Sequence, residues 1–355
     1  SLHPLGIYEC SNCSLIQIIE SPPARTFYDN YIYTSSSSPD MYANFLSLKE
    51  AILQEVKNVD QRISILDIGC NDGLLLSMFK ELTCFTLYGT DPSPIALKAS
   101  SGNYTLHSEY FPGPKTKAAG PYDIIIGTNS LAHIPDIGKC FKEIKEILAD
   151  DGILVIEVSD FEQMARKGAW DYIYHEHLYY YTKSSLTLIL SEHGLDVYRI
   201  DDIGTKGGSI RVFAKKSSCH MPSSRLESEM QCPAIATLKR KYRESIESYT
   251  TLARGLASSP KLYGYGACAT GSVTISQHQI FRSLESIIDD NVNRQGLFAP
   301  HWGVPVIPLN DVSFAPDDIV IVFAWRFIEQ IREKILNYCN SNDLPVPIIV
   351  KSINS

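Results

Sequence analysis

The sequence has no excess of basic side chains: 32 Lys and Arg residues stand against 40 Asp and Glu residues, and the formal net charge is −8. Proteins that bind the phosphate backbone usually carry a clustered surplus of Lys and Arg, so we expect no nucleic-acid partner. No apolar run approaches the roughly 20 residues that cross a bilayer, and residues 1–4 lack the positive charge of a signal sequence. We therefore expect a cytoplasmic protein with no membrane partner.

The nine cysteines do not suggest a disulfide framework, because they are odd in number and scattered through a long chain. This distribution is typical of a reducing compartment, where cysteines stay as free thiols. We expect Cys70, Cys84 and Cys140 to be packing residues. Cys10 and Cys13, which lie close together near the start, are the one pair for which we do not assume free thiols.

The apolar content, 44% of 355 residues, is enough for two cores and suggests two or three domains. Residues 1–60 are aromatic and polar, with a helix expected over 39–56, and they look like a lid or arm. From residue 61 short apolar runs alternate with helical stretches, which predicts a parallel sheet covered by helices on both faces. The expected strands of this domain are 63–68, 86–89, 122–127 and 153–158.

A polar stretch over residues 217–257, with apolar residues at helical spacing, separates a second unit from the first. Four further apolar runs predict a smaller α/β domain, at residues 261–265, 286–290, 318–324 and 346–350. The predicted division is therefore an arm over 1–60, a first α/β domain over 61–217 and a second α/β domain over 218–355.

Residues 65–73, Ile-Leu-Asp-Ile-Gly-Cys-Asn-Asp-Gly, run from an apolar strand into a tight turn that opens a helix over 74–79. Gly69 and Gly73 allow the backbone to pass close to a ligand. Asp91 ends the next strand about 20 residues later, the position from which a carboxylate accepts ribose hydroxyl hydrogen bonds in a doubly wound sheet. A structural strand-to-helix corner is the alternative, and Asp91 at this distance favours a nucleoside ligand.

The turn lacks the third glycine of a dinucleotide fingerprint, and Asp67 would repel a pyrophosphate. S-adenosylmethionine carries an ammonium group and a sulfonium instead, so an acidic loop suits it. Here the sequence resembles the class I methyltransferases, whose first motif matches this segment. The resemblance places Asp91 on the ribose. It places Asn129, just after the strand predicted at 122–127, near the reacting methyl. It places the loop along the methionine part of the cofactor, with the binding residues Asp67, Gly69, Asn71 and Gly73.

Two histidine-bearing segments follow predicted strands. Residues 129–135 contain His133 and follow the strand predicted at 122–127. Residues 174–177 contain Glu176 and His177 and come after the strand predicted at 153–158. Ligands bind beyond the carboxyl ends of strands in open α/β sheets, so both segments belong to a candidate site. A histidine there can take a proton from a carbon next to a carbonyl, and Glu176 can orient it or share the proton.

A zinc site is the alternative for the second segment, with His175, Glu176 and His177 as ligands. Their spacing is not that of a His-Glu-x-x-His helix, so catalysis is favoured over metal binding. The remaining histidines lack such surroundings. We expect surface positions for His107, His193 and His220.

At these residues the chain resembles the sugar C-methyltransferases that act on nucleotide-linked 4-keto deoxysugars. The matching segments run in order along nearly the whole chain, at 8–17, 31–36, 65–73, 132–135, 174–177, 207–211, 264–267 and 323–325. The resemblance implies that His177 is the base and that Glu176, His133 and a tyrosine of the arm surround it. We assign the tyrosine to Tyr31 or Tyr33, between which the spacing does not decide. It also implies S-adenosylmethionine as methyl donor and a nucleotide-linked keto sugar as substrate.

These residue types support a mechanism in which the base removes the proton beside the sugar ketone and hydrogen bonds stabilise the enolate oxygen. The carbon then attacks the sulfonium methyl in line, a step that depends on positioning. An oxygen or nitrogen methyltransferase for another small molecule is one rival function. A non-catalytic sugar-nucleotide binding protein is another, although it would need no base beside the cofactor. A keto-sugar epimerase would need the base but no methyl donor.

The chain departs from the family pattern near its start. The family carries two Cys-x-x-Cys pairs that together bind one structural zinc, and here only Cys10 and Cys13 are present in that region. Two thiolates do not close a tetrahedral site. We therefore expect that the natural amino terminus, with the first half of the zinc module, precedes this sequence, and that Cys10 and Cys13 are zinc ligands.

In the second domain, the turn over residues 264–266, with Gly271 beyond it, has the wrong spacing for a nucleotide fingerprint. We interpret it as a turn that supports the substrate cleft, and the resemblance implies that this domain helps to hold the sugar nucleotide. Arg211 and Arg294 are candidates for the diphosphate, because guanidinium groups pair bidentately with phosphate oxygens. Each is equally consistent with a surface ion pair.

Overall fold

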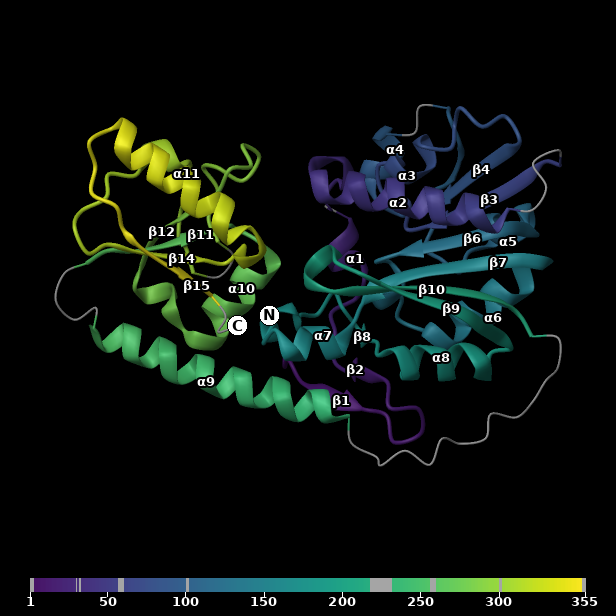
Figure 1. Ribbon diagram of the computed structural model, residues 1–355, viewed down its shortest axis with the longest axis horizontal. Coiled ribbons are helices and arrows are strands. Elements are labelled where there is room, and N and C mark those ends of the chain that lie inside the picture. The colour runs from purple at the N-terminus through teal and green to yellow at the C-terminus, as the bar shows by residue number, and fades with distance from the viewer. Residues whose placement is uncertain are drawn as a thin grey trace. The chain divides into compact units, whose positions relative to one another are not determined.

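The computed structural model describes residues 3–29, 31, 33–56, 61–99, 102–217, 232–255, 260–299 and 302–352 (Figure 1). The chain forms two compact units, one of residues 1–161 and 175–231 and the other of residues 162–174 and 232–355. In this division the arm belongs to the first unit, the short segment 162–174 belongs to the second, and the boundary predicted after residue 217 falls after residue 231. His220 lies outside the described residues.

The first unit is built on one mixed sheet. Its strands are β3 (Ile63–Ile68), β4 (Phe85–Thr90), β5 (Thr105–His107), β6 (Tyr122–Thr128), β7 (Leu148–Ser159), β9 (Leu195–Ile203) and β10 (Ser209–Lys216). Their order in space is β5-β4-β3-β6-β7-β10-β9. All neighbours from β5 to β7 are parallel, whereas β10 pairs antiparallel with β7 and β9. The order changes direction between β3 and β6, so the loops after these strands diverge and leave room for a ligand.

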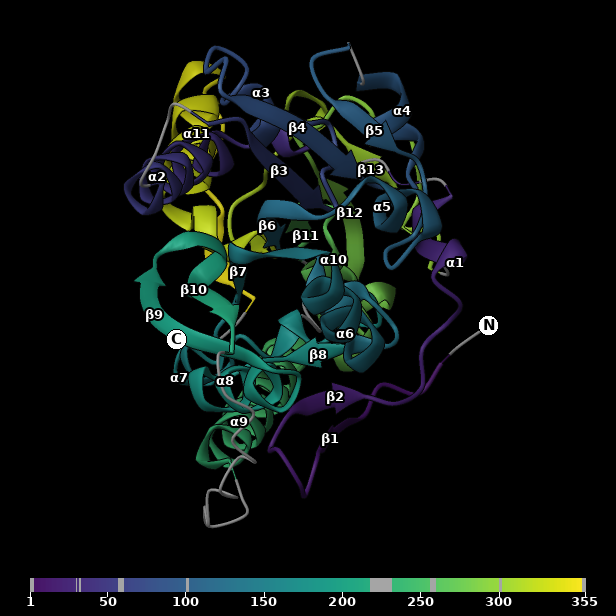
Figure 2. The same ribbon diagram turned by 90° about the vertical axis from the view of Figure 1, so that its right-hand side faces the viewer.

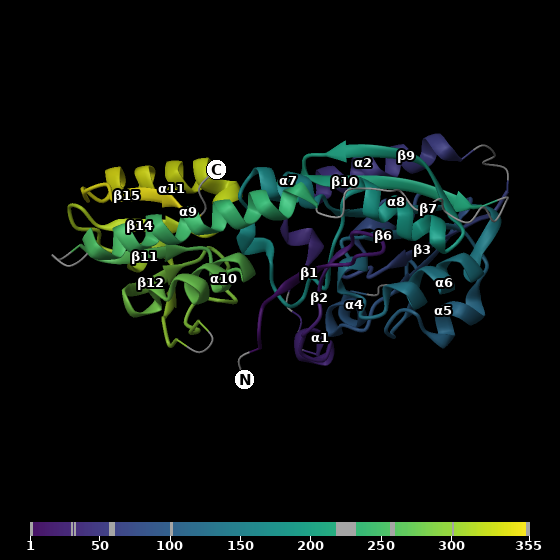
Figure 3. The ribbon, with the colours of Figure 1, turned by 90° about the horizontal axis from the view of Figure 1, so that it is seen from below.

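Helices cover both faces of this sheet. They are α2 (Pro39–Glu55), α3 (Leu74–Ser77), α4 (Pro94–Ala99), α5 (Pro114–Ala119), α6 (Ile137–Ile147) and α8 (Lys183–Glu192). Successive side chains of a strand point to opposite faces, so Ile65 of β3 packs in one core and Leu66 in the other. The first core includes α2 and α3 and the second includes α6 and α8; Figure 3 shows α2 and α6 on opposite sides of the strands.

The arm joins the first unit through a small antiparallel sheet. β1 (Ile7–Glu9) pairs with β2 (Ile16–Ile18), and β2 pairs with β8 (Tyr179–Tyr180), as Figure 2 shows. Beyond β2 the arm continues through α1 (Arg25–Tyr28) and the short helix η1 (Ser35–Ser37) into α2. Strand pairing therefore attaches the arm to the segment that follows His177.

The second unit contains a smaller sheet in which every pairing is parallel. Its elements are α9 (Pro233–Gly255), β11 (Leu262–Tyr265), α10 (Ala269–His278), β12 (Leu284–Ile288), β13 (Val306–Ile307), β14 (Ile319–Val322), α11 (Ile328–Ser341) and β15 (Ile348–Lys351). The spatial order is β13-β12-β11-β14-β15. One core packs α11 against the strands and the other packs α10 and Tyr249 of α9 against them. The segment 162–174 of this unit contains part of α7 (Phe161–Arg166) and η3 (Trp170–Tyr172).

The predicted fold class is confirmed in both units. All four strands predicted for the first domain and all four predicted for the second correspond to strands of the structure, with shifts of a few residues at the ends. The predicted packing of Cys70 and Cys140 is also confirmed, because both are buried in the cores of the first unit, while Cys84 is half-buried. Within the described residues, no helix combines the length and apolar character that spanning a membrane requires.

Candidate active site

The loop after β3, residues 69–73, depends on its two glycines. Gly69 and Gly73 have φ values of 76° and 72°, in the left-handed region that other residues rarely adopt. A Cβ added at Gly69 would lie 2.6 Å from Cβ of Ser130, in the segment after β6. A Cβ added at Gly73 would lie 2.6 Å from the ring of Tyr104. Glycine at position 69 therefore lets this cofactor loop pack against the segment that begins with Asn129.

Asp91, directly after β4, fastens the cofactor loop. Its Oδ2 accepts a hydrogen bond from the backbone N of Asn71 at 3.0 Å, and its Oδ1 accepts one from the backbone N of Ser93 at 2.8 Å. The residue is buried, with 8% of its surface exposed. Each carboxylate oxygen can accept a further hydrogen bond, so Asp91 retains the capacity to receive ribose hydroxyls.

Asp67, near the end of β3, is a buried acceptor beside Asp91. Its Oδ1 has no hydrogen-bond partner in the described part of the chain. Burial, and then the charge of Asp91, raises the pKa of Asp67 to about 8. An unpartnered acceptor of this kind fits a cationic ligand, because a buried polar group without a partner is costly. The residues present therefore fit S-adenosylmethionine: Asp67 would hold its ammonium group and Asp91 its ribose.

Cofactor binding is expected to release a proton from Asp67. With a pKa of about 8 the carboxyl group is mostly protonated at pH 7 in the free protein, and a bound ammonium group favours its ionised form. S-adenosylhomocysteine, which keeps the ammonium group, should displace about one proton at pH 7, and its affinity should rise as the pH approaches 8. Calorimetric titration in buffers of different ionisation enthalpy measures the proton number. Asp67→Asn should abolish the release, and a parent protein that releases no proton would exclude Asp67 as the ammonium partner.

The structure brings the two predicted histidines together. His133 ends the short helix η2 (Leu131–His133), and His177 lies shortly before β8. A backbone hydrogen bond of 2.7 Å from Leu178 N to Ala132 O joins the two segments. The ring centroids of His133 and His177 are 5.0 Å apart, with the planes at 75°.

Tyr28 of the arm contacts His133. Its hydroxyl lies 2.9 Å from Nδ1 of His133. The ring of Tyr31 packs against Tyr28 at 5.4 Å between centroids, and Tyr33 packs against Tyr31 at 6.4 Å. The sequence analysis did not name Tyr28, and its assignment of Tyr31 or Tyr33 beside the base stays a prediction. The tyrosine-rich run was the right signal, and Tyr28 lies in it.

Glu176 shares the surroundings of these tyrosines. Burial raises its own pKa. Burial, and then the charge of Glu176, raises the pKa of both Tyr28 and Tyr31. A carboxyl group with a raised pKa close to an imidazole can share a proton with it.

His175 has a different role from its neighbours. Its Nε2 lies 2.9 Å from the backbone O of Pro4, and its backbone O accepts a 3.0 Å hydrogen bond from Oγ of Ser21. His175 therefore holds the start of the arm. Across the described residues no three His, Cys, Asp or Glu side chains form a group that could hold a metal ion, so the zinc alternative for residues 175–177 has no support.

Cys10 and Cys13 form a tight turn at the end of β1. Backbone hydrogen bonds of 2.9 Å run from Cys10 N to Leu15 O and from Ser14 N to Cys10 O. The two side chains lie within hydrogen-bonding reach of each other. They offer two ligands of a tetrahedral zinc site, and no third ligand joins them from the part of the chain that the structure describes. The structural zinc stays a prediction.

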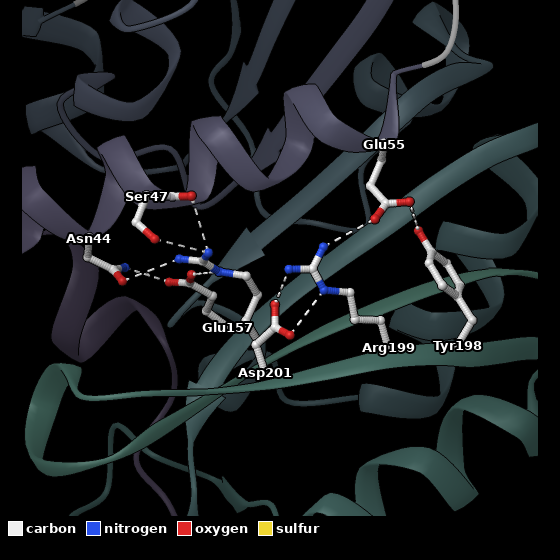
Figure 4. Close-up of polar contacts among 8 residues, drawn as sticks. Asn44, Ser47, Glu55, Glu157, Tyr198, Arg199 and Asp201 are labelled. Atoms are coloured by element: carbon white, nitrogen blue, oxygen red, sulfur yellow. Dashed lines mark hydrogen bonds and ion pairs between the residues drawn. The ribbon is translucent and has the colours of Figure 1, made fainter.

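Arg211 is neither free for a diphosphate nor part of a surface ion pair, so both sequence predictions for it are wrong. Its Nε donates to Oε1 of Glu157 at 2.6 Å, and the two side chains are 4% and 1% exposed. Nδ2 of Asn44 donates to Oε2 of Glu157 at 2.7 Å, and Nη1 of Arg211 donates to the backbone O of Ser47 at 3.3 Å (Figure 4). The pair joins β7 and β10 to α2. Arg294 does form a partly exposed ion pair, with 3.3 Å between its Nη1 and Oδ2 of Asp289.

Two histidines expected at the surface lie in other surroundings. His107, at the end of β5, is 9% exposed, and its ring stacks on Tyr88. Burial lowers the pKa of His107. His193 follows α8, where its Nδ1 lies 2.7 Å from the backbone O of Ile189 and its ring packs against Phe141. The surface prediction is wrong for His107, whose ring packs against an aromatic ring as an apolar side chain does, whereas His193 is half-buried.

Comparison with known proteins adds to this geometry. A family model described as a methyltransferase domain matches residues 42–200, and one described as a C-methyltransferase C-terminal domain matches residues 204–346. The curated C-methyltransferase NovU of Streptomyces niveus is 24% identical over 351 residues, which cover 93% of this chain and 82% of that protein.

Solved structures resemble part of the chain at low identity. The PH0226 protein from Pyrococcus horikoshii OT3 is 15% identical, with 52% of this chain and 95% of that chain covered and a TM-score of 0.43. Magnesium protoporphyrin IX methyltransferase from Synechocystis PCC 6803 with bound S-adenosylhomocysteine is 18% identical, with 50% and 83% covered and a TM-score of 0.39.

The strand order, the glycine loop with its two carboxylates and the methyltransferase model together define an S-adenosylmethionine-dependent methyltransferase. The second model narrows this class to enzymes that methylate carbon. The chain is similar to C-methyltransferases: residues 42–200 match a general methyltransferase domain, residues 204–346 match the C-terminal domain of C-methyltransferases, and NovU is similar over 93% of the chain.

Proposed function

We propose that the protein methylates a carbon next to the ketone of a nucleotide-linked 4-keto deoxysugar, through an enolate of the sugar. The observation that carries this proposal is the 2.9 Å contact between Tyr28 and His133 beside the ring of His177. This cluster stands next to the cofactor loop, because the backbone N of His133 donates to O of Ser130 at 3.0 Å and Ser130 packs against Gly69. A base and hydrogen-bond donors therefore lie beside the expected methyl donor.

His177 is the base in this proposal. A neutral imidazole takes the proton from the carbon beside the ketone, and the electron pair of the broken C–H bond passes into the enolate. Glu176, buried nearby with a raised pKa, can orient the imidazolium or share its proton. The bound cofactor supplies the methyl group that the carbon accepts.

His133 stabilises the enolate oxygen in this proposal, and Tyr28 holds its ring in place. When the Tyr28 hydroxyl donates to Nδ1 of His133, the hydrogen of that ring is on Nε2, which can donate to the substrate. Donors held in place before the reaction lose little energy in reorganisation, and removal of one typically costs about 100 to 1,000-fold in rate. The contact between the two side chains fixes the Nε2 donor of His133 in advance.

The second unit supports the nucleotide part of the proposal. Its sheet order reverses between β11 and β14, and open α/β sheets bind nucleotides at such a point. Gly266, directly after β11, has a φ of 98°, and Asp289, directly after β12, accepts a 2.6 Å hydrogen bond from the backbone N of Ala267. A glycine turn and a carboxylate after adjacent strands repeat the arrangement of the cofactor loop. Arg294, paired with Asp289 and partly exposed, stays the candidate for the diphosphate.

Incubation with methyl-labelled S-adenosylmethionine and a panel of nucleotide-linked sugars tests the proposal. The 4-keto deoxysugars are expected to take up label on a carbon next to the ketone, where NMR locates it. The matching 4-hydroxy sugars are the control and should take up none, because they cannot form the enolate. Label on oxygen or nitrogen would favour the rival methyltransferase functions, and absence of label from every keto sugar would contradict the proposed substrate.

A further inference from the structure

We propose that Asn71 is a positioning residue that couples the cofactor loop to the contact between Tyr28 and His133. Its effect on catalysis rests on the proposed function, whereas its effect on the order of the arm does not. Asn71 lies inside the cofactor loop between the two glycines, and 8% of the residue is exposed.

The carboxamide of Asn71 joins the loop to the arm through both of its polar atoms. Oδ1 accepts a hydrogen bond from the backbone N of Ser35 at 2.9 Å, and Nδ2 donates to the backbone O of Tyr33 at 3.0 Å. The backbone N of Asn71 donates to Oδ2 of Asp91 at 3.0 Å. One residue thus contacts both the carboxylate expected at the ribose and the main chain of the arm.

Asparagine suits this position for two reasons. The φ of Asn71 is 50°, in a region that asparagine tolerates better than most other side chains. The carboxamide also presents an acceptor and a donor together, which matches one N–H and one C=O of the arm. Aspartate would keep the acceptor and lose the donor, and glycine would keep the backbone and lose both. The neighbouring Asp72 adds only an exposed link, from the backbone N of Ser36 to its Oδ2 at 2.9 Å.

Packed aromatic rings connect the part of the arm that Asn71 binds to the part that contacts His133. The ring of Tyr33 packs on Tyr31 and the ring of Tyr31 packs on Tyr28, and the backbone N of Tyr31 donates to O of Tyr28 at 3.3 Å. Tyr28 then meets His133. The arm is anchored at the loop by Asn71 and at the histidines by Tyr28. Any ligand that stabilises the cofactor loop is therefore expected to stabilise the contact between Tyr28 and His133 as well.

Amide hydrogen exchange tests the coupling without any sugar substrate. In the parent protein, S-adenosylhomocysteine is expected to slow exchange of the Ser35 amide, because this amide donates to Asn71. Asn71→Gly keeps the backbone conformation but removes both side-chain bonds, so exchange at Ser35 should be fast with or without the ligand. By linkage the variant should also bind the ligand about fivefold more weakly or worse. Asn71→Asp, which keeps the acceptor, should restore protection of Ser35.

Asp343→Gly is the matched control for the backbone. Asp343 is an exposed residue of the second unit with a φ of 53°, so the change to glycine has the same local effect without touching the loop. Exchange at Ser35 and ligand affinity should both stay at the parent values. If exchange at Ser35 in the parent protein does not respond to S-adenosylhomocysteine, or if Asn71→Gly retains the response, the coupling is absent.

Kinetics with a sugar that the protein methylates distinguish a role of Asn71 in positioning Tyr28 from a general structural effect. Tyr28→Phe removes the hydroxyl that fixes the ring and tautomer of His133, the enolate donor, and should lower kcat by about 100-fold or more. Asn71→Gly should lower kcat by less at saturating cofactor, and combining it with Tyr28→Phe should cause no further loss, because Asn71 acts through Tyr28. If kcat of the double variant falls by the product of the two single losses, Asn71 does not act through Tyr28. If no sugar is methylated, the proposed function fails while the exchange experiment still decides the role of Asn71.

Discussion

His177→Ala is expected to remove both methyl transfer and the exchange of the sugar proton with deuterated water. A positioned general base contributes about 100 to 10,000-fold in rate, and the loss should lie at the upper end because no other group in the proposal takes this proton. Exchange needs the base and the ketone but no methyl donor, so it can be followed by NMR in the complex with S-adenosylhomocysteine. Labelled S-adenosylmethionine measures the transfer.

His175→Ala is the matched control for this experiment. His175 lies two positions away, but it contacts the backbone of Pro4, so its loss should leave methylation and exchange near the parent rates. His133→Asn should slow both steps by the smaller factor of a hydrogen-bond donor. Affinity for S-adenosylhomocysteine should stay near normal in all three variants. A His177→Ala protein that methylates at close to the parent rate would overturn the mechanism and favour an oxygen methyltransferase with a different base.

Arg211→Met is expected to lower the free energy of unfolding of the first unit by about 3 to 5 kcal/mol, because it leaves Glu157 as an uncompensated buried charge. The Glu157 side chain is only 1% exposed, and the hydrogen bond that it accepts from the neutral Asn44 does not balance its charge. All three tryptophans, Trp170, Trp302 and Trp325, belong to the second unit. In urea unfolding, the loss of stability of the first unit should therefore appear in circular dichroism, which follows both units. It should appear much less in tryptophan fluorescence.

Two further variants separate the buried charge from the loss of the Arg side chain. Combining Glu157→Gln with Arg211→Met should recover most of the stability, since glutamine removes the charge and can still accept from Asn44. Arg199→Met is the surface control: Arg199 pairs with Glu55 and Asp201 at 34% side-chain exposure (Figure 4), and its loss should cost about 1 kcal/mol or less. A double variant as unstable as Arg211→Met alone would show that packing, and not charge, dominates.

The cofactor loop could be predicted from the sequence because its signals are local. An apolar strand, a turn with Gly69 and Gly73 and a carboxylate at Asp91 occupy one continuous stretch, and their spacing reflects the lengths of a strand, a turn and a helix. The structure has β3 at Ile63–Ile68, the predicted limits. His133 and His177 could be found in the same way, because parallel strands end at one edge of a sheet and residues that follow them meet there.

Tertiary structure alone decided which tyrosine contacts His133. Tyr28, Tyr31 and Tyr33 are chemically identical and lie in one short run, so their local pattern contains no preference. The hydrogen bond from Asn71 to the backbone of Tyr33 and the contact of Tyr28 with His133 distinguish them, and both join segments that are distant in sequence.

Arg211 illustrates the same limit for charged residues. Its partner Glu157 is 54 positions away, and the two meet because β10 runs antiparallel beside β7, with both side chains on the face that α2 covers. From sequence, an arginine on a strand is compatible with a phosphate site, a surface pair or a buried pair. The free energy of burying the charge depends on partners from other elements, and a local pattern of residues does not contain them.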